Sequence, residues 1–451
     1  MASAAEQLAA NFNFGSIGKA KELKSRILFT LGALIVARIG SYIPMPGIDP
    51  AALYAFMQQS GGGLLDVFNT FSGGAVGRMA IFALGIMPYI SASIIIQLMT
   101  TVFPELEALK KEGEAGRKVL NQYTRYFTVA LAVIQGYGIA IGLEHVSSGH
   151  SVVIHPGFFF RIGAVITLTG GTMLLMWIGE QITSRGVGNG VSLIIFAGIV
   201  AVFPRYINQA VQLVQTGSMN GGALLIIFAL VIAVTGAIVF MERAQRRLLV
   251  QYPKRQVGNR MFGGDTSFLP LKINTSGVIP PIFASSLLLL PATVMGFLAN
   301  ANLPSWAQWL PGAVGQLQHG RPLFMVLYGA LIIFFCFFYT SVVFNPEDTA
   351  ENLRKYGGFM PGIRPGKRTA EYLDFVLTRI TVIGAAYIAV VCLLPEFLIG
   401  YYNAPFYLGG TSVLIVVSVT MDTVTQIQSH LLAHQYEGLI RKSKLRGNRG
   451  R

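Results

Sequence analysis

The sequence predicts an all-α polytopic membrane protein with ten transmembrane helices in two inverted five-helix halves. Three observations predict this class: an apolar composition, long runs without a charged residue, and an alternation of basic and nearly uncharged loops. Of the 451 residues, 53% are hydrophobic and only 12% are charged, and the mean hydropathy is +0.57. Because a soluble domain carries about a quarter charged residues, this composition excludes an ordinary soluble protein.

Ten apolar segments are long enough to cross a bilayer as helices. Residues 323–344 form a run of 22 without a charge and residues 223–241 a run of 19. About 20 helical residues span the ~30 Å hydrocarbon core. The apolar runs and their flanks predict spans at 27–43, 79–103, 127–143, 158–179, 190–214, 223–241, 276–298, 323–344, 376–399 and 405–427. Residues 1–26 are polar and no cleavage site follows the first apolar run, so the first span is expected to be retained.

The lysines set the predicted orientation of these spans. All twelve lysines fall in alternate loops, whereas the opposite loops hold only a few arginines, such as Arg78, Arg205 and Arg321. The positive-inside rule then places both termini in the cytoplasm, in agreement with an even number of spans. Since each half contains five spans, an odd number, the two halves should run in opposite directions through the membrane.

Two similar proline-containing segments support this internal duplication. They run from Gly85 to Leu98 and from Gly277 to Leu290, and their first ten positions share Gly, Pro, Ile, Ala and Ser. A proline inside a membrane helix weakens or kinks it, so we expect interrupted helices in spans 2 and 7. Paired interruptions in corresponding positions indicate a working site where the halves meet. The alternative is chance similarity between two apolar stretches.

The predicted organisation has four parts. A cytoplasmic N-terminal segment covers 1–26, and the first half covers 27–214, including a glycine-flanked segment at 61–78. The second half covers 215–429, with long cytoplasmic loops at 242–275 and 345–379, and a basic tail covers 430–451. Both loops are basic and rich in turn residues, which favours structured docking surfaces for a negatively charged partner such as ribosomal RNA. The alternative is that they are ordinary positive-inside loops attracted to anionic lipid.

The predicted spans are nearly free of ionisable residues. Arg38 lies in the first span and Asp422 near the end of the last. The absence of a carboxylate relay argues against an ion-coupled transporter. No histidine or cysteine pattern indicates catalysis or a metal site, and the two cysteines, Cys336 and Cys392, read as small core residues. We therefore expect neither enzymatic activity nor a cofactor.

The segment at 61–78 carries apolar residues with helical spacing between glycine clusters. It is too short to cross the membrane. It is either an amphipathic helix on the outer surface or a segment that re-enters the membrane where protein shields it.

Long motifs along the chain resemble the SecY family, the channel-forming subunits of the bacterial protein-secretion translocon. They include RILFTLGALIVARIGSYIPMPGI at 26–48, FALGIMPYISASIIIQL at 82–98, RGVGNGVSLIIFAGIV at 185–200, PLKINTSGVIPPIFASS at 270–286 and FYLGGTSVLIVVSVTMD at 406–422. The resemblance implies two inverted halves that open like a clamshell around a central pore, with spans 2 and 7 forming a lateral gate toward lipid.

The resemblance also implies functional residues, matched motif by motif. The external plug would comprise Leu64, Leu65, Asp66, Val67, Phe68, Asn69, Thr70, Phe71, Ser72, Gly73 and Gly74. The pore ring would comprise Ile86, Ile90, Val191, Ile195, Ile282 and Ile415, where Val191 departs from the usual isoleucine. The lateral gate would comprise Pro88, Ser91, Ile94, Gln97, Pro280, Pro281, Phe283 and Ser286. Cytoplasmic docking would involve Lys254, Arg255, Arg354, Lys355 and Arg364.

The implied function is translocation of unfolded preproteins across the bacterial inner membrane, with signal sequences and nascent spans released into the lipid bilayer. An aliphatic ring blocks ions by dewetting and grips varied side chains through non-directional dispersion. Energy would come from the SecA motor ATPase or a translating ribosome, with SecE and SecG as membrane subunits and SecD, SecF and YidC as accessory partners. The alternatives are a secondary transporter with inverted repeats and a scaffold or insertase without a pore.

Overall fold

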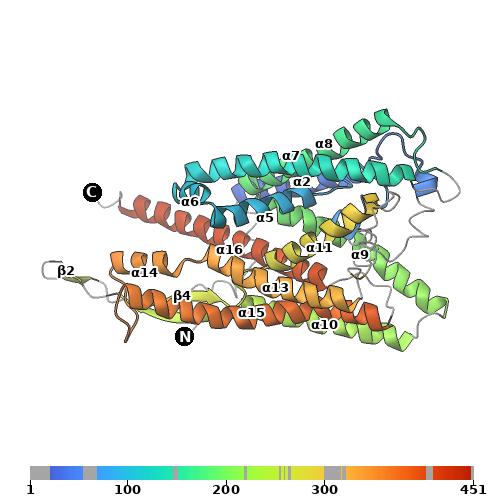
Figure 1. The fold of residues 1–451 in the computed structure, drawn as a ribbon. Helices are drawn as coiled ribbons and strands as arrows, with labels where there is room; N and C mark the ends of the chain where they lie inside the picture. Colours follow the sequence, from blue (N-terminus) through green and yellow to red (C-terminus); the bar gives the residue numbers. More distant parts are fainter. Residues whose placement is uncertain are drawn as a thin grey trace. The chain divides into compact units, whose positions relative to one another are not determined.

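The fold is known from a computed structural model that describes residues 21–53, 69–145, 151–217, 221–252, 255–257, 260–262, 266–298, 316, 321–402 and 410–447. Five of the predicted plug residues, at 64–68, and the predicted docking residue Lys254 lie outside these ranges. Figure 1 labels the helices and strands β2 and β4 along the chain.

Each of the ten predicted spans coincides with a helix in the described part of the chain. These helices are α2 (Lys21–Gly40), α5 (Met87–Val102), α7 (Glu114–His145), α8 (Phe158–Arg185), α9 (Gly190–Gln215), α10 (Gly221–Arg243), α11 (Ile279–Leu298), α13 (Pro322–Val343), α15 (Lys367–Tyr402) and α16 (Gly410–Gly447). Shorter elements connect them: α6 (Pro104–Lys111), α14 (Pro346–Lys355), β1 (Gln245–Gln251), β2 (Arg255–Val257), β3 (Arg260–Phe262) and β4 (Thr266–Lys272).

Not all ten helices are long and apolar enough to cross a membrane by themselves. In the described ranges, seven helices are long and apolar enough to cross a membrane. An eighth span is added if α5 and α6, which are bent by 101° at their junction, count as one. Pro104 at the first position of α6 explains the break, because proline disfavours a helical conformation in the residue before it. The first turns of α2 carry Lys21, Glu22, Lys24 and Arg26, which lower its apolar character.

The prolines of the two repeated segments begin helices instead of interrupting them. Pro88 is the second residue of α5, and Pro280 and Pro281 are the second and third of α11. In the first turn of a helix a proline loses no intrahelical hydrogen bond, so the expected kinks are absent from these positions. Each helix follows a glycine in the left-handed region, Gly85 at φ 58° and Gly277 at φ 63°. The second span accordingly begins at Met87, not at 79 as expected, and the preceding residues form turns.

The chain divides into two compact units. One comprises Met1–Ala92, Thr124–Arg205 and Ile415–Arg451, and the other comprises Ser93–Tyr123 and Tyr206–Leu414. We refer to them as unit 1 and unit 2. The predicted inverted halves at 27–214 and 215–429 stay a prediction.

The core of unit 1 joins the turns after α2 to the helix pair α7 and α8. Met45, Leu53, Met79, Val152 and Leu168 are all nearly inaccessible to solvent and belong to one apolar cluster. A backbone hydrogen bond from Met45 N to Met79 O, 2.8 Å long, ties the turn after α2 to the turns before α5. The residues just before α5 are therefore tied to the core of unit 1.

The two long loops of unit 2 form one structured body. Strands β1 and β4 pair in antiparallel register from Gln245 with Lys272 to Gln251 with Thr266. Gln251 and Phe359 then exchange backbone hydrogen bonds of 2.8 and 2.9 Å, which joins the hairpin to the loop after α14. Beneath them an apolar cluster includes the buried residues Leu248, Val250, Met360 and Leu373. The expectation of structured loops is confirmed.

Candidate functional site

The described part of the predicted plug is a closed turn built on Asn69. The carbonyl of Asn69 accepts a hydrogen bond of 2.7 Å from Gly74 N, and its side-chain Oδ1 accepts one of 2.8 Å from Gly77 N. Ser72 Oγ donates to the same carbonyl over 3.2 Å, and Thr70 is buried. An asparagine that satisfies backbone donors in this way stabilises a turn. Residues 69–77 thus have a defined shape.

This turn lies against α9 at a contact between two glycines. A Cβ atom added to Gly198 would lie 2.9 Å from the Phe71 carbonyl oxygen and 3.3 Å from Gly73 N. A Cβ added to Gly73, which has φ 67°, would lie 2.9 Å from Gly198 Cα. Only glycine lets the two backbones approach this closely, because any side chain would occupy the same space.

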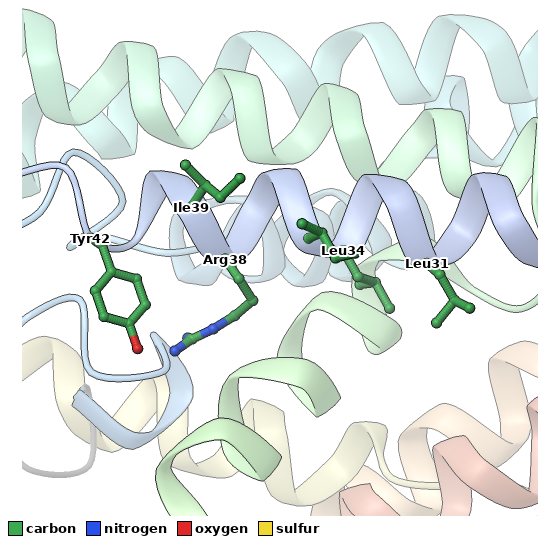
Figure 2. A pocket seen from close by; sticks show the side chains of 6 residues that line it. Leu31, Leu34, Arg38, Ile39 and Tyr42 are labelled. Carbon is green, nitrogen blue, oxygen red and sulfur yellow. The ribbon is translucent and has the colours of Figure 1, made fainter.

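An arginine of α2 holds the same turn from another side. Arg38 Nη1 donates a hydrogen bond of 2.8 Å to the Gly73 carbonyl, and Figure 2 shows its side chain reaching away from α2. A charged donor strengthens such a bond relative to a neutral one. Glycine packing and one charged hydrogen bond therefore anchor the C-terminal part of the plug segment.

Two predicted pore-ring residues line the space beside this turn. A cavity of about 30 Å³ is lined by Phe71 and Ser72 of the turn, Ile86 before α5 and Ile195 of α9, together with residues of α2 and α8. This space has room for one or two water molecules at most. Ile86 and Ile195 are both buried. The structure thus brings part of the predicted plug and part of the predicted ring together within unit 1.

The remaining ring residues divide between the units. Ile90 lies in the first turn of α5, Val191 in the first turn of α9, and Ile415 in α16 is almost completely buried. These three belong to unit 1, whereas Ile282 belongs to unit 2, where its carbonyl accepts hydrogen bonds from Ser285 and Ser286. Closure of all six residues into one ring stays a prediction.

The predicted gate residues lie on α5 and α11. On α5, Pro88, Ser91 and Ile94 are buried, whereas Gln97 is partly exposed. On α11, Phe283 packs edge-on against Phe335 and Tyr339 of α13, with ring centroids 5.7 and 6.3 Å apart. Ser286 bonds within its own helix, and Pro280 and Pro281 occupy its first turn. The gate assignment itself stays a prediction.

Glycines also permit close packing of helices where the segment RGVGNGV, at 185–191, joins α8 to α9. A Cβ on Gly190 at the start of α9 would collide with the Gly179 carbonyl of α8, so glycine at this position permits the two helices to approach closely. Gly188, at φ 92°, donates its N–H to Gln426 Oε1 of α16 over 2.8 Å. The sequence reading missed Gly198 and Gln426. The FAGIV motif around Gly198 was the available signal for a close backbone approach.

The predicted docking residues are surface groups of the structured loops. Arg354 and Lys355 end α14 and are exposed, and Lys355 pairs with Glu351 over 3.2 Å. Arg364 is exposed on the turn before α15, and Arg255 pairs with Phe262 across the second hairpin. Arg354, Lys355 and Arg364 therefore leave their charges at the surface, and their role in docking stays a prediction.

The residues that the structure describes hold no cluster of three or more His, Cys, Asp or Glu side chains suited to a metal ion. Cys336 on α13 and Cys392 on α15 are buried and form no disulfide, as expected for small core residues.

Comparison with known proteins agrees with the motifs. The SecY family model matches residues 80–424. Protein translocase subunit SecY of Escherichia coli (strain K12) is 53% identical over 426 residues, covering 94% of this chain and 96% of the relative. Protein translocase subunit SecY of Rickettsia bellii (strain RML369-C) is 53% identical over 438 residues, covering 97% and 100%.

Solved structures share the fold. One described as a protein conducting channel superposes with a TM-score of 0.64 at 18% identity, covering 90% of this chain and 92% of the other. Sec61 in the canine ribosome-channel complex from the endoplasmic reticulum gives a TM-score of 0.62 at 17% identity, with the same coverage of both chains. With a family match over most of its length and relatives more than half identical, this chain belongs to the SecY family.

Proposed function

We propose that this chain is the channel-forming subunit of a protein translocase, through which unfolded secretory polypeptides cross the inner membrane. The observation that carries the proposal is the docked turn at 69–77, whose Phe71 and Ser72 share a small cavity with Ile86 and Ile195. The turn is held by a charged hydrogen bond, a glycine contact and the packing of Ala75 with Ala37 and Leu175, and a local segment of this kind can open without unfolding the helices around it. A turn that can undock and dock again in this way is suited to a seal that must open repeatedly.

The proposed pore ring seals by its chemistry. Isoleucine and valine side chains offer no hydrogen bonds to water or ions, so a narrow ring of them empties of water and blocks conduction. During transport the same side chains close around the moving polypeptide through dispersion contacts that do not depend on its sequence. This explains how one channel would accept many substrates, and the chain would supply a passage rather than catalysis.

A lateral gate between α5 and α11 would release apolar segments into lipid. Both helices start two residues after a left-handed glycine, Gly85 or Gly277. Such a glycine permits backbone rotation that other residues resist, and proline in the following turn keeps the helix start itself rigid. Each gate helix would therefore move as a rod about its N-terminal end.

The basic cytoplasmic loops would receive the partners that drive transport. Sec61 and Ssh1, whose structures share this fold, are bound to ribosomes in those structures. The exposed arginines and lysines of α14 and its neighbouring turn suit ribosomal RNA or an acidic face of the SecA motor. SecE and SecG would complete the membrane complex, with both termini of this chain in the cytoplasm.

Ion conductance in planar bilayers tests the seal. We expect the intact purified complex to be closed and a variant lacking Leu64–Gly74 to conduct. If both stayed silent while the protein moved a small solute along a gradient, the transporter reading would replace the channel.

A thiol pair tests the docked turn more directly. In a background with both native cysteines replaced by serine, we would introduce Phe71→Cys and Ile195→Cys, which line the same cavity, and join them with a short bifunctional thiol reagent. Preprotein transport should stop on cross-linking and return when a cleavable linker is reduced. Each single-cysteine variant is the matched control. Transport that continues with the two positions joined would refute the proposal.

A further inference from the structure

The junction that leads from β4 into the predicted gate helix α11 contains buried polar side chains. Residues 273–278 belong to neither a helix nor a strand, yet Asn274 is only 4% exposed and Ser276 only 5%. Buried polar side chains at a bend require specific hydrogen-bond partners. The partners of Asn274 therefore show what this bend holds in place.

The side-chain amide of Asn274 joins three parts of the junction. Its Nδ2 donates to Glu242 Oε1 at the end of α10 over 2.5 Å and to the Gly277 carbonyl over 3.2 Å. Its Oδ1 accepts a hydrogen bond of 3.2 Å from Ser276 Oγ. An ionised carboxylate can only accept, so the nitrogen of the amide must face Glu242, and both of its N–H groups have acceptors.

The bond to the Gly277 carbonyl replaces one that the helix cannot make. At a helix start this carbonyl would accept from the backbone nitrogen three or four residues later. Those residues are Pro280 and Pro281, which have no N–H. The first repeated segment differs, because the residue four positions after Gly85 is Tyr89, which carries an N–H. Asn274 thus supplies the donor that the pair of prolines removes from α11.

The chain before Gly277 is fixed, whereas the space around Gly277 is open. Ile273 N donates to the Ala244 carbonyl over 3.1 Å. On α15, a Cβ added to Gly384 would lie 2.7 Å from the Ile273 carbonyl oxygen. A Cβ added to Gly277 would meet nothing within 4 Å. Rotation of α11 against α10 and α15 would therefore concentrate at Gly277, which has φ 63°.

We infer that Asn274 is a positioning residue of the lateral gate, which holds α11 at one angle by donating to the Gly277 carbonyl while Glu242 holds Asn274 in place. The inference rests on the proposed role of α11 as a gate helix. When the bond is broken, α11 can turn about Gly277, so apolar segments would enter lipid more readily. If Asn274 only filled the bend, losing this bond would lower stability without loosening α11 in particular.

An exchanged pair of side chains separates these two roles. In Asn274→Asp the side chain loses both N–H donors and sets a carboxylate against Glu242. Adding Glu242→Gln places an amide opposite that carboxylate, so the link to α10 returns with the same total charge, but an aspartate cannot donate to the Gly277 carbonyl. The matched control is Thr275→Ala, which removes a hydrogen bond of 2.9 Å from Thr275 Oγ1 to the Lys272 carbonyl in the same segment.

Hydrogen exchange of the intact complex in nanodiscs, followed by mass spectrometry over residues 277–288, measures the hold on α11. Loss of one hydrogen bond between neutral groups changes an opening equilibrium by about 2- to 12-fold. We expect exchange of this segment to rise at least about twofold in both Asn274→Asp and the double variant, whereas the apparent melting temperature should fall only in Asn274→Asp. Thr275→Ala should exchange like the unmodified protein.

A rescue variant tests the missing donor itself. Pro281→Ala restores an N–H four residues after Gly277, so the carbonyl regains a helical partner. In this background the double variant should exchange at the rate of Pro281→Ala alone. A role of Asn274 in filling the bend would not respond to this change.

Partitioning of a model nascent span of borderline hydrophobicity then connects the hold on α11 to the gate. The share of the span that enters lipid should rise about twofold or more in Asn274→Asp and in the double variant, and should stay constant in Thr275→Ala. If the unmodified complex neither moved nor inserted the span, the proposed channel function would fail, whereas the exchange measurement would still decide the role of Asn274.

Either of two results would overturn the inference. Exchange at the unmodified level in the double variant would mean that the bond to Gly277 is lost without loosening α11. Faster exchange with an unchanged inserted share would mean that Asn274 does not act on the gate. If Asn274→Asp did not assemble, the double variant, which keeps the charge of the pair, would still be compared with Thr275→Ala.

Discussion

Replacing Gly198 with alanine should loosen the plug segment without weakening the fold. The added methyl group would lie 2.9 Å from the Phe71 carbonyl oxygen and 3.3 Å from Gly73 N. Both are backbone atoms of the docked turn and cannot rotate away as a side chain can. The turn must therefore move off α9 or remain in a strained contact.

The expected size of the effect follows from overpacking. Forcing one methyl group into a filled contact costs about 1–3 kcal/mol. That energy corresponds to a shift of about 5- to 150-fold toward the undocked state. In the helix itself alanine is favoured over glycine by about 1 kcal/mol, so α9 should become more stable, not less.

Single-channel recording in planar bilayers is the assay. The open probability of the resting complex should rise at least fivefold in Gly198→Ala. The matched control is Gly170→Ala on α8, where an added Cβ would meet nothing within 4 Å, so only the helix propensity changes. If Gly198→Ala were as tightly closed as Gly170→Ala and the unmodified protein, docking of the turn on α9 would not be what seals the channel.

Three further predictions concern single contacts. Arg38→Gln removes a charged hydrogen bond to the plug turn, worth about 1.5–3 kcal/mol, and should raise resting conductance, with Arg38→Lys restoring part of the seal. Glu144→Gln leaves Arg161 without its carboxylate partner. Because the Glu144 side chain is only 6% exposed, we expect the apparent melting temperature to fall by a few degrees. Gly410→Ala would set a methyl group against the Val391 carbonyl, so little assembled complex should be recovered from membranes.

Each of these variants has a specific check. A silent Arg38→Gln channel would show that the glycine contact and the packing of Ala75 hold the turn without this hydrogen bond. An unchanged melting temperature for Glu144→Gln would mean that the hydrogen bond from Gly157 N to Glu144, 2.9 Å long, suffices to hold the external turn. For Gly410→Ala the control is Gly236→Ala on α10, where an added Cβ meets nothing, and equal yields of the two would contradict the close approach of α15 and α16.

The sequence predicted the positions of the helices because the apolar pattern of a membrane span is local. All ten predicted spans coincide with helices in the described residues, and the motifs correctly indicated the SecY family. The sequence revealed the repeated Gly–Pro segments, but it did not reveal that their prolines begin helices instead of interrupting them. A proline lowers helix stability in the interior and is harmless in the first turn, and only the backbone shows that Gly85 and Gly277 place Pro88 and Pro280 in first turns.

The sequence by itself determined the class, the family, the expected topology and the residue types available for a seal. Composition, charge alternation and long motifs are sufficient for these, since each depends only on order along the chain. The tertiary structure alone decided that Gly73 rests on Gly198, that Arg38 holds the Gly73 carbonyl, and that Gln251 bonds to Phe359. Each of these contacts joins residues far apart in sequence, and whether they meet depends on how whole helices pack, which no local pattern encodes.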